Sequence, residues 1–161
     1  MPKWGYSVID EMLNQEKTAK ASGRELKVSH KAAREVCKAI NGRMLNDAKE
    51  YLRDVMAKKR AIPYTRYNKK LPHRHGIVNS FSGRYPVKAS EQILGVLRSA
   101  QSNAENKGLD VDRLRIIHAA AYQGMKLKRY TPRAHGSASP KYDTLTHIEI
   151  VLDEKPTQGE Q

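Results

Sequence analysis

One cysteine and two closely spaced histidines of a basic loop could suggest a metal site. Cys37, His73 and His75 offer the sulfur and nitrogen ligands that Zn²⁺ prefers, but no fourth candidate lies at a suitable spacing. Cys37 is also the only cysteine, so neither an intrachain disulfide nor a cysteine-rich zinc motif can form. We therefore interpret His73 and His75 as part of a basic segment and predict no metal site and no cofactor.

Two further histidines are candidates for acid–base chemistry. His118 and His147 lie in segments that alternate like strands, and the two side chains could face each other across a strand pair. Catalysis would also need a nucleophile and an orienting carboxylate, and the sequence indicates neither. Phosphate-binding, dinucleotide-binding, nucleophile-elbow and metalloprotease motifs are missing as well. The sequence predicts packed or edge histidines in a protein that is not an enzyme.

The strongest chemical signal is the distribution of charge. The chain has 30 Lys and Arg residues against 17 Asp and Glu, which gives a net charge of +13. Residues 61–85 and 113–142 contain no acidic residue, whereas a surface that is merely solvated normally mixes both signs. Arginine pairs with phosphate in a bidentate manner, and Tyr64, Tyr67 and Tyr130 offer rings on which unpaired RNA bases could stack. The predicted partner is a polyanion.

An anionic membrane surface is the competing partner for so basic a chain. No run approaches the roughly 20 apolar residues of a spanning helix, and the N-terminus lacks a signal-peptide pattern. A single cysteine fits a reducing compartment. We expect a soluble, cytoplasmic protein without a membrane anchor.

Three segments have apolar residues at helical spacing. The first begins after Ser29, in the position of an N-cap, and ends before Gly42. The second covers residues 45–56, and the third runs from Pro86 to Gly108. These segments predict two short amphipathic helices joined by a tight turn, followed by a long core helix.

The remaining regular segments predict strands. Residues 18–28 indicate a short strand with a bend, and residues 114–119 and 146–152 alternate and should pair antiparallel. Residues 122–143 continue this alternation towards a tip rich in proline and glycine. Arms of about nine residues at roughly 3.3 Å each would project about 30 Å, so we favour an extended hairpin, ordered on its partner, over a flexible loop.

Residues 58–86 predict a long basic loop that orders on a partner and adds little to the core. The expected fold class is α+β, with three helices packed on a three-stranded antiparallel sheet and a protruding β-hairpin. We expect an N-terminal extension over residues 1–17, a single domain over 18–152 and a flexible tail over 153–161.

Several motifs resemble one known family. The runs LRIIHAAA at 114–121, KRYTPRAHG at 128–136 and THIEIV at 146–151 are similar to the C-terminal motifs of the universal large-subunit ribosomal protein family numbered twenty-two in bacteria and seventeen in eukaryotes. SHKAAR at 29–34 resembles the start of that family's first helix. Within residues 55–88, IPY, YNKK and GRYP resemble an insertion of archaeal and eukaryotic members, which indicates an archaeal-type protein.

The resemblance implies a structural constituent of the large ribosomal subunit. Its body would bind large-subunit ribosomal RNA and support assembly, and its hairpin would reach the wall of the nascent-peptide exit tunnel. The implied partners are that RNA, neighbouring large-subunit proteins and the nascent polypeptide. The residues expected to bind ribosomal RNA are Lys31, Arg34, Lys58, Lys59, Arg60, Arg66, Lys69, Lys70, Arg74, Arg84, Lys88, Lys126, Lys128, Arg129 and Arg133. Those expected at the hairpin tip in the tunnel are Arg133, Ala134, His135, Gly136 and Ser137.

One departure and two rival functions qualify this interpretation. After Gly136 the chain reads SASP, where many relatives of the family are more basic, so the tip would carry less charge than theirs. A basic DNA-binding or chromatin-associated protein would need a recognition helix, and no predicted helix clearly has one. An RNA-modifying enzyme would need a cofactor loop or a catalytic constellation, and neither is visible.

Overall fold

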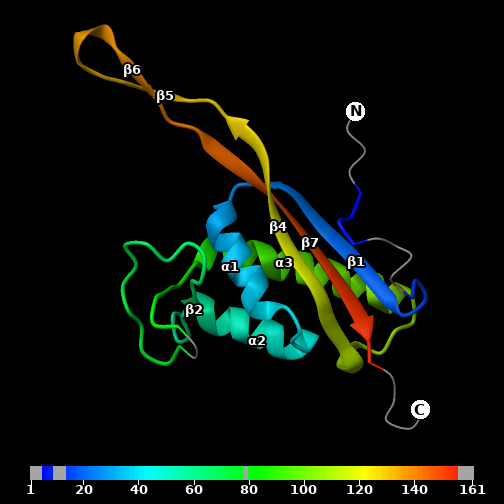
Figure 1. The fold of residues 1–161 in the computed structure, drawn as a ribbon. Helices are drawn as coiled ribbons and strands as arrows, with labels where there is room; N and C mark the ends of the chain where they lie inside the picture. Colours follow the sequence, from blue (N-terminus) through cyan, green and yellow to red (C-terminus); the bar gives the residue numbers. More distant parts are fainter. Residues whose placement is uncertain (1–4, 9–13, 78–79, 156–161) are drawn as a thin grey trace.

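The computed structural model describes residues 5–8, 14–77 and 80–155, and it has an α+β fold with a projecting hairpin (Figure 1). The main sheet contains β1 (Thr18–Leu26), β4 (Leu114–Leu127) and β7 (Asp143–Glu154), in the order β1–β7–β4. Both pairings in this sheet are antiparallel. The predicted fold class, three helices on a three-stranded antiparallel sheet, is confirmed.

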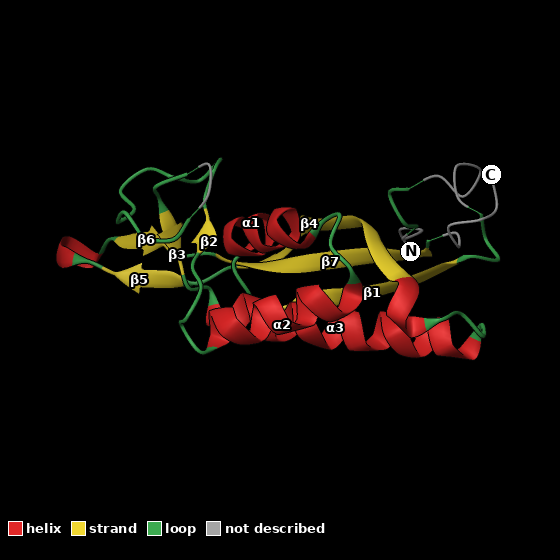
Figure 2. Cartoon of the chain, turned by 90° about the horizontal axis from the view of Figure 1, so that it is seen from below, coloured by secondary structure: helices red, strands yellow, loops and turns green. Residues whose placement is uncertain are grey.

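The three helices are α1 (His30–Ile40), α2 (Leu45–Met56) and α3 (Val87–Asn106). Gly42, with φ of +81°, supplies the left-handed residue that the tight turn between α1 and α2 requires. α1 packs on β4 and α3 on β1 and β7, while α2 lies along α3 (Figure 2). No described helix is both long enough and apolar enough to cross a bilayer.

The core lies between the helices and one face of β7. Ile148, Ile150 and Leu152 alternate along this strand, and all three are buried against the helices. Burying an aliphatic side chain of this size stabilises the fold by roughly 1.5–3 kcal/mol. His147 and Glu149 on the opposite face of β7 are also almost fully buried. Both faces of the central strand are therefore covered.

A bulge in β4 changes which side chains face the core. Ile116 is paired with Leu152 but His118 with Val151, so one residue, Ile117, is unpaired and the alternation reverses. Ala119 and Ala121 then pack towards the core. The alternation predicted for residues 114–119 would put His118 on the same face as Leu114 and Ile116, and this is wrong because alternation alone does not reveal a bulge. The prediction that His118 and His147 face each other is also wrong, since His147 is opposite Tyr122.

The hairpin extends β4 and β7 away from the helices (Figure 1). Beyond Leu127 the chain continues into β5 (Tyr130–Pro132), which pairs antiparallel with β6 (Ala138–Pro140). Between these short strands, His135 and Gly136 have φ of 56° and 67° and turn the chain at the tip. The predicted continuation of the strands beyond the body is therefore present.

Two predicted boundaries can be compared with the strands. β1 begins at Thr18, where the domain was predicted to begin, but β7 continues to Glu154, two residues beyond the predicted end at 152. The backbone N–H of Glu154 donates a hydrogen bond to the carbonyl of Lys17 (3.1 Å). Most of the predicted flexible tail, residues 156–161, and residues 1–4 and 9–13 of the predicted extension lie outside the described residues.

The root of the hairpin has no room for a side chain at Gly124. A Cβ there would lie 2.9 Å from His147 Nε2 and 3.2 Å from the carbonyl oxygen of Leu145. We expect Gly124→Ala to separate β4 from β7 locally and to lower the free energy of unfolding by about 1–3 kcal/mol. Urea unfolding followed by circular dichroism measures this change.

The matched control is Gly95→Ala on the exposed side of α3, where a Cβ meets nothing within 4 Å. Alanine has the higher helix propensity, so this change should stabilise the protein by roughly 0.5–1 kcal/mol. Equal stability of the two variants would contradict the crowding at Gly124.

Candidate nucleic-acid interface

The basic loop over residues 58–86, the insertion loop, is attached to the body by a small sheet and two buried side chains. β2 (Ile62–Pro63) pairs with β3 (Gly83–Arg84). Ile62 is fully buried, and Tyr64 is only 5% exposed. The prediction that this loop adds little to the core is therefore wrong, because two isolated apolar anchors create no periodic pattern. Tyr64 is also too buried to offer a stacking face, which corrects its predicted role.

A buried carboxylate organises the next part of the loop. Glu35 on α1 is 1% exposed and accepts backbone hydrogen bonds from Thr65 (3.1 Å), Arg66 (3.1 Å) and Tyr67 (3.4 Å). The Thr65 hydroxyl donates to the same carboxylate, and Arg34 Nη1 forms an ion pair with it at 2.8 Å. One side chain thus holds three consecutive loop amides against α1.

These contacts also determine the charge state of Glu35. Burial alone would raise its pKa, but the hydrogen bonds from Thr65, Arg34 and Arg66 and the charge of Arg34 outweigh burial, and the pKa lies below its usual value. The carboxylate therefore stays ionised at neutral pH. Arg34, predicted to bind RNA, is half-buried and uses its guanidinium to neutralise Glu35.

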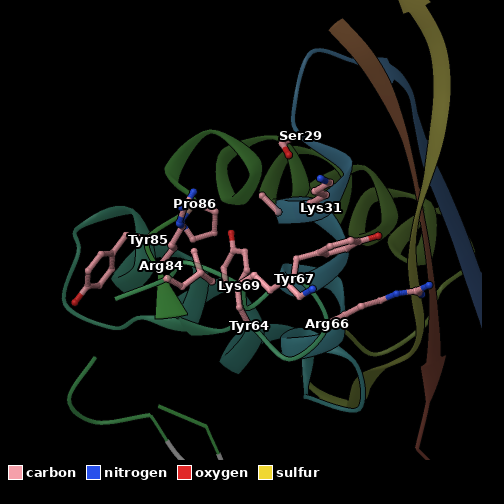
Figure 3. Close-up of a pocket in the computed structure, with 11 residues that line it drawn as sticks. Ser29, Lys31, Tyr64, Arg66, Tyr67, Lys69, Arg84, Tyr85 and Pro86 are labelled. Atoms are coloured by element: carbon pink, nitrogen blue, oxygen red, sulfur yellow. The ribbon is translucent and has the colours of Figure 1, made fainter. Parts of the chain in front are cut away.

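The loop and the start of α1 together enclose a pocket of about 620 Å³. Four of the predicted RNA-binding residues line it, namely Lys31, Arg66, Lys69 and Arg84. Figure 3 shows Tyr64 and Tyr67 between Tyr85 at one end and Arg66 at the other. Residues more than fifty positions apart in the chain thus form one basic and aromatic concavity.

Cations lie close to the tyrosine rings around this pocket. Lys31 Nζ is 5.6 Å and the Arg66 guanidinium carbon 5.9 Å from the centre of the Tyr67 ring. The guanidinium carbon of Arg74 lies 5.2 Å from the centre of the Tyr85 ring. Such contacts are energetically weak at exposed sites, about 0.5–1 kcal/mol each, so these cations can turn towards a stronger anionic partner.

The other predicted RNA-binding residues lie outside the pocket but remain accessible. Lys58, Lys59 and Arg60 follow the end of α2, and Lys88 is in the first turn of α3. Lys126, Lys128, Arg129 and Arg133 are exposed along the hairpin, as are all the predicted tip residues from Arg133 to Ser137. Two of these cations have an acidic neighbour, since Arg60 lies 3.6 Å from Asp54 and Arg129 lies 3.6 Å from Asp143.

A second buried carboxylate, Glu149, lies at the root of the hairpin. It accepts hydrogen bonds from the backbone N–H and hydroxyl of Ser7 and from Tyr122 Oη (3.0 Å), and it contacts His118 Nε2 at 3.0 Å. Burial would raise its pKa, but these hydrogen bonds outweigh burial and lower it. Glu149 thus attaches the N-terminal segment to the sheet.

Ser7, His118 and Glu149 do not form a catalytic triad. Ser7 Oγ and Glu149 Oε1 both contact the same imidazole nitrogen, Nε2. In a triad the carboxylate orients one nitrogen so that the other can accept the serine proton. The geometry here is that of a structural hydrogen-bond cluster.

The described residues do not support the metal site considered for Cys37. They contain no group of three or more His, Cys, Asp or Glu side chains placed to hold an ion. Cys37 is buried, and burial raises the pKa of its thiol to about 12, which disfavours the thiolate that binds metals. His73 packs edge-on against Phe81 with ring centres 5.1 Å apart.

The sequence matches the family described as "Ribosomal protein L22p/L17e" over residues 21–153. The chain belongs to this family. It is 49% identical to the large ribosomal subunit protein uL22 of Methanopyrus kandleri over 159 residues, which cover 96% of this chain and 100% of that protein. It is 47% identical to uL22 of Methanocaldococcus jannaschii over 154 residues, covering 96% and 97% of the two chains.

The uL22 protein of Archaeoglobus fulgidus is 46% identical over 150 residues, which cover 93% of this chain and 94% of that protein. The resemblance drawn from the motifs, including its archaeal type, is therefore confirmed. The family is one of ribosomal structural proteins, so the chain is not an enzyme, and its place in the cell is the ribosome in the cytoplasm.

Sequence reasoning missed the two buried carboxylates, Glu35, which organises the candidate interface, and Glu149, which lies at the root of the hairpin. Glu35 is the one acidic residue between Leu26 and Asn46, and it adjoins the apolar positions of α1. A lone acid on an apolar helix face is a signal for a buried, hydrogen-bonded carboxylate. Glu149 gave no such signal, because a polar residue is expected at alternate positions of a strand.

The Glu35 contacts predict a pH-dependent effect of Glu35→Gln. Because the folded-state pKa is depressed, the ionised carboxylate stabilises the fold above the unfolded-state pKa, near 4.5, and this contribution is lost as the pH falls through the lower folded-state value. At neutral pH the variant should lose about 2 kcal/mol of unfolding free energy, the scale of hydrogen bonds to a charged group.

Urea titrations at several pH values measure this difference, and the gap between wild type and variant should narrow in acid. Hydrogen exchange at the amides of Thr65 and Arg66 should accelerate in Glu35→Gln. Glu50→Gln, at an exposed position of α2, is the matched control and should have little effect at any pH. A gap that does not depend on pH would contradict the proposed role of the Glu35 charge.

Proposed function

We propose that the chain is a structural constituent of the large ribosomal subunit that binds large-subunit ribosomal RNA and supports its assembly. The observation that carries this proposal is the exposure of the basic residues in the two acid-free stretches, one around the pocket and one along the hairpin. Cations gathered without acids raise the local potential and favour a phosphate backbone. The relatives named as large ribosomal subunit proteins support the same partner.

We also propose that the hairpin contributes to the wall of the nascent-peptide exit tunnel. Tyr130 and Tyr142 pack edge-on with ring centres 6.2 Å apart, and both remain exposed. Apart from such local contacts the distal hairpin has no core, so a surrounding partner would have to supply most of its packing. The tip residues from Arg133 to Ser137 would then lie nearest to the passing polypeptide, with neighbouring large-subunit proteins beside the arms.

Charge alone would also fit a DNA-binding protein, but the helices do not favour it. Helical readout of the major groove needs a face that presents arginine, asparagine or glutamine to the bases. The long helix α3 is buried along one side and exposes the acidic Glu91 and Glu105. The exposed Arg98 is seven residues from each of these acids and therefore shares their side of the helix.

The first prediction of this proposal concerns the salt dependence of RNA binding. If five or more phosphates are neutralised, log affinity should fall with log salt at a slope steeper than about −4. Replacing Lys69, Lys70 and Arg74 with alanine should weaken binding and reduce the slope by up to roughly 2.5, because three contacts would be lost. Filter binding to large-subunit RNA at graded salt measures both.

The control is the pair Arg53→Ala and Arg98→Ala, exposed cations of α2 and α3 outside the acid-free stretches. These changes should alter the slope less than the triple variant does. Circular dichroism should show an intact fold in both proteins, since Lys69, Lys70 and Arg74 are exposed. A nearly flat salt dependence of the wild-type protein would refute phosphate-dominated binding.

The second prediction concerns the tip. Deleting residues 131–140 and closing the arms with a short turn should cost the free protein little stability, because this segment buries little area. A photo-cross-linker at position 135 or 137 should label stalled nascent chains above a certain length. Normal incorporation into ribosomes without labelling at any chain length would show that the tip does not face the tunnel.

A further inference from the structure

We infer that the pocket beside α1 receives one unpaired RNA nucleotide, whose base stacks in the pocket while its phosphate is held by Lys31, Arg84 and the first turn of α1. This inference rests on the proposed function and specifies which RNA feature the insertion loop recognises. The pocket volume of about 620 Å³ falls within the roughly 300–1,000 Å³ typical of sites that enclose a small molecule or a single group.

The aromatic wall gives the pocket its preference for a base. Tyr67 is partly exposed, and it lines the pocket together with Tyr85, which is likewise partly exposed (Figure 3). His30 packs against Tyr67 at an interplanar angle of 87° with ring centres 6.4 Å apart. Lys31 and Arg66 lie over the Tyr67 ring, so a base that stacks there would take the place of a cation, which could then turn towards the phosphate. Bases stack on such rings largely independently of their identity, because every base has a π face.

The start of α1 provides the anion site. Ser29 is its N-cap residue but makes no side-chain cap hydrogen bond within the described chain, and the first turn contains no acidic residue. The amides of a first helical turn have no partner within their helix, and together with the helix dipole they favour an anion. Lys31 lies in this turn and Arg84 across the pocket, so a phosphate there would meet cations from two separate segments.

The pocket is held open before any partner arrives. Glu35 fixes the backbone of Thr65, Arg66 and Tyr67, and the β2–β3 pairing holds Arg84 opposite. A site organised in advance loses less conformational entropy on binding than a flexible loop would. The loop therefore offers a shaped receptor in addition to its charge.

An unpaired nucleotide fits these features better than the alternatives do. Paired bases stay stacked inside a duplex and cannot place a ring in a concave site, whereas bulged or looped bases can be turned out and stacked on side chains. An acidic peptide would satisfy the cations but would leave the tyrosine rings without a flat partner. The combination of ring faces and an anion site on one concavity favours the nucleotide.

The test compares two RNA hairpins that differ only in one bulged nucleotide, bound to the full-length protein at low salt. We expect the bulged RNA to bind at least several-fold more tightly, consistent with the stacking of one base. Tyr67→Ala should abolish this preference, and Tyr67→Phe should retain it. Tyr142→Ala, at an exposed tyrosine of the hairpin, is the matched control and should leave the preference unchanged.

Because Tyr67 also packs partly against the core, a second measurement uses the unaltered protein. Thiouridine at the bulge should cross-link on irradiation to a peptide that contains Tyr67 or Tyr85, as identified by mass spectrometry. Equal affinity for the two RNAs, or cross-links confined to other segments, would overturn the nucleotide site while leaving phosphate binding intact. Displacement of the RNA from the pocket by polyglutamate alone, with no preference for the bulge, would assign the pocket to an acidic peptide instead.

These outcomes differ from a failure of the proposed function. If neither hairpin nor large-subunit RNA bound at low salt, the RNA-binding role itself would be refuted. Binding of both hairpins with the same affinity and a steep salt slope would preserve that role and refute only the bulge-specific site.

Discussion

The pairing of β7 with its two neighbours is the interaction on which the rest of the molecule depends. β7 bonds to β1 on one edge and to β4 on the other, and its inward side chains form the floor of the core. The same strand leaves the body as one arm of the hairpin. Because the ladder between β4 and β7 runs from the core into the projection, the core determines the direction in which the hairpin leaves the body.

Two buried carboxylates connect this frame to the segments added around it. Glu35 holds the insertion loop to α1, and Glu149 holds the N-terminal segment to the outer face of the sheet. The exposed basic stretches contain no acidic residues. The two buried carboxylates, in contrast, bind backbone amides and basic side chains. A buried carboxylate is stable only when its hydrogen bonds are satisfied, so each one specifies a single conformation of the segment that it binds.

The sequence predicted the helices and strands correctly where buried residues recur at regular spacing. It failed where the pairing or burial of a single residue determines the local structure. The helices around Val36 and Leu97 and the alternation of β7 follow from regular spacing of apolar residues, and the structure reproduces them. The bulge at Ile117 depends on backbone pairing with β7, which no local pattern encodes. Ile62 and Tyr64 are anchors whose burial depends on tertiary contacts, so a sequence window around them resembles an exposed loop.

Within the candidate site, the cations could be predicted from charge, but their gathering around one pocket could not, because it follows from the Glu35 contacts.

If the chain binds RNA as proposed, its two basic regions would meet that partner in different ways. The insertion loop is anchored by buried side chains and by Glu35, so its pocket exists before binding and can discriminate by shape. The distal hairpin has exposed arms and a tip without buried residues, so its position relative to a partner depends mainly on the partner. Rigid sites lose little entropy on binding and so gain affinity, whereas segments that order on the partner lose affinity per unit of interface but can cover a large contact surface. One small core supports both regions, because the hairpin extends from it through the β4–β7 ladder and the insertion loop is attached to it separately, through α1. Under the proposed function, the chain would combine a pocket formed in advance, whose loop backbone Glu35 holds, with an extension that orders on its partner.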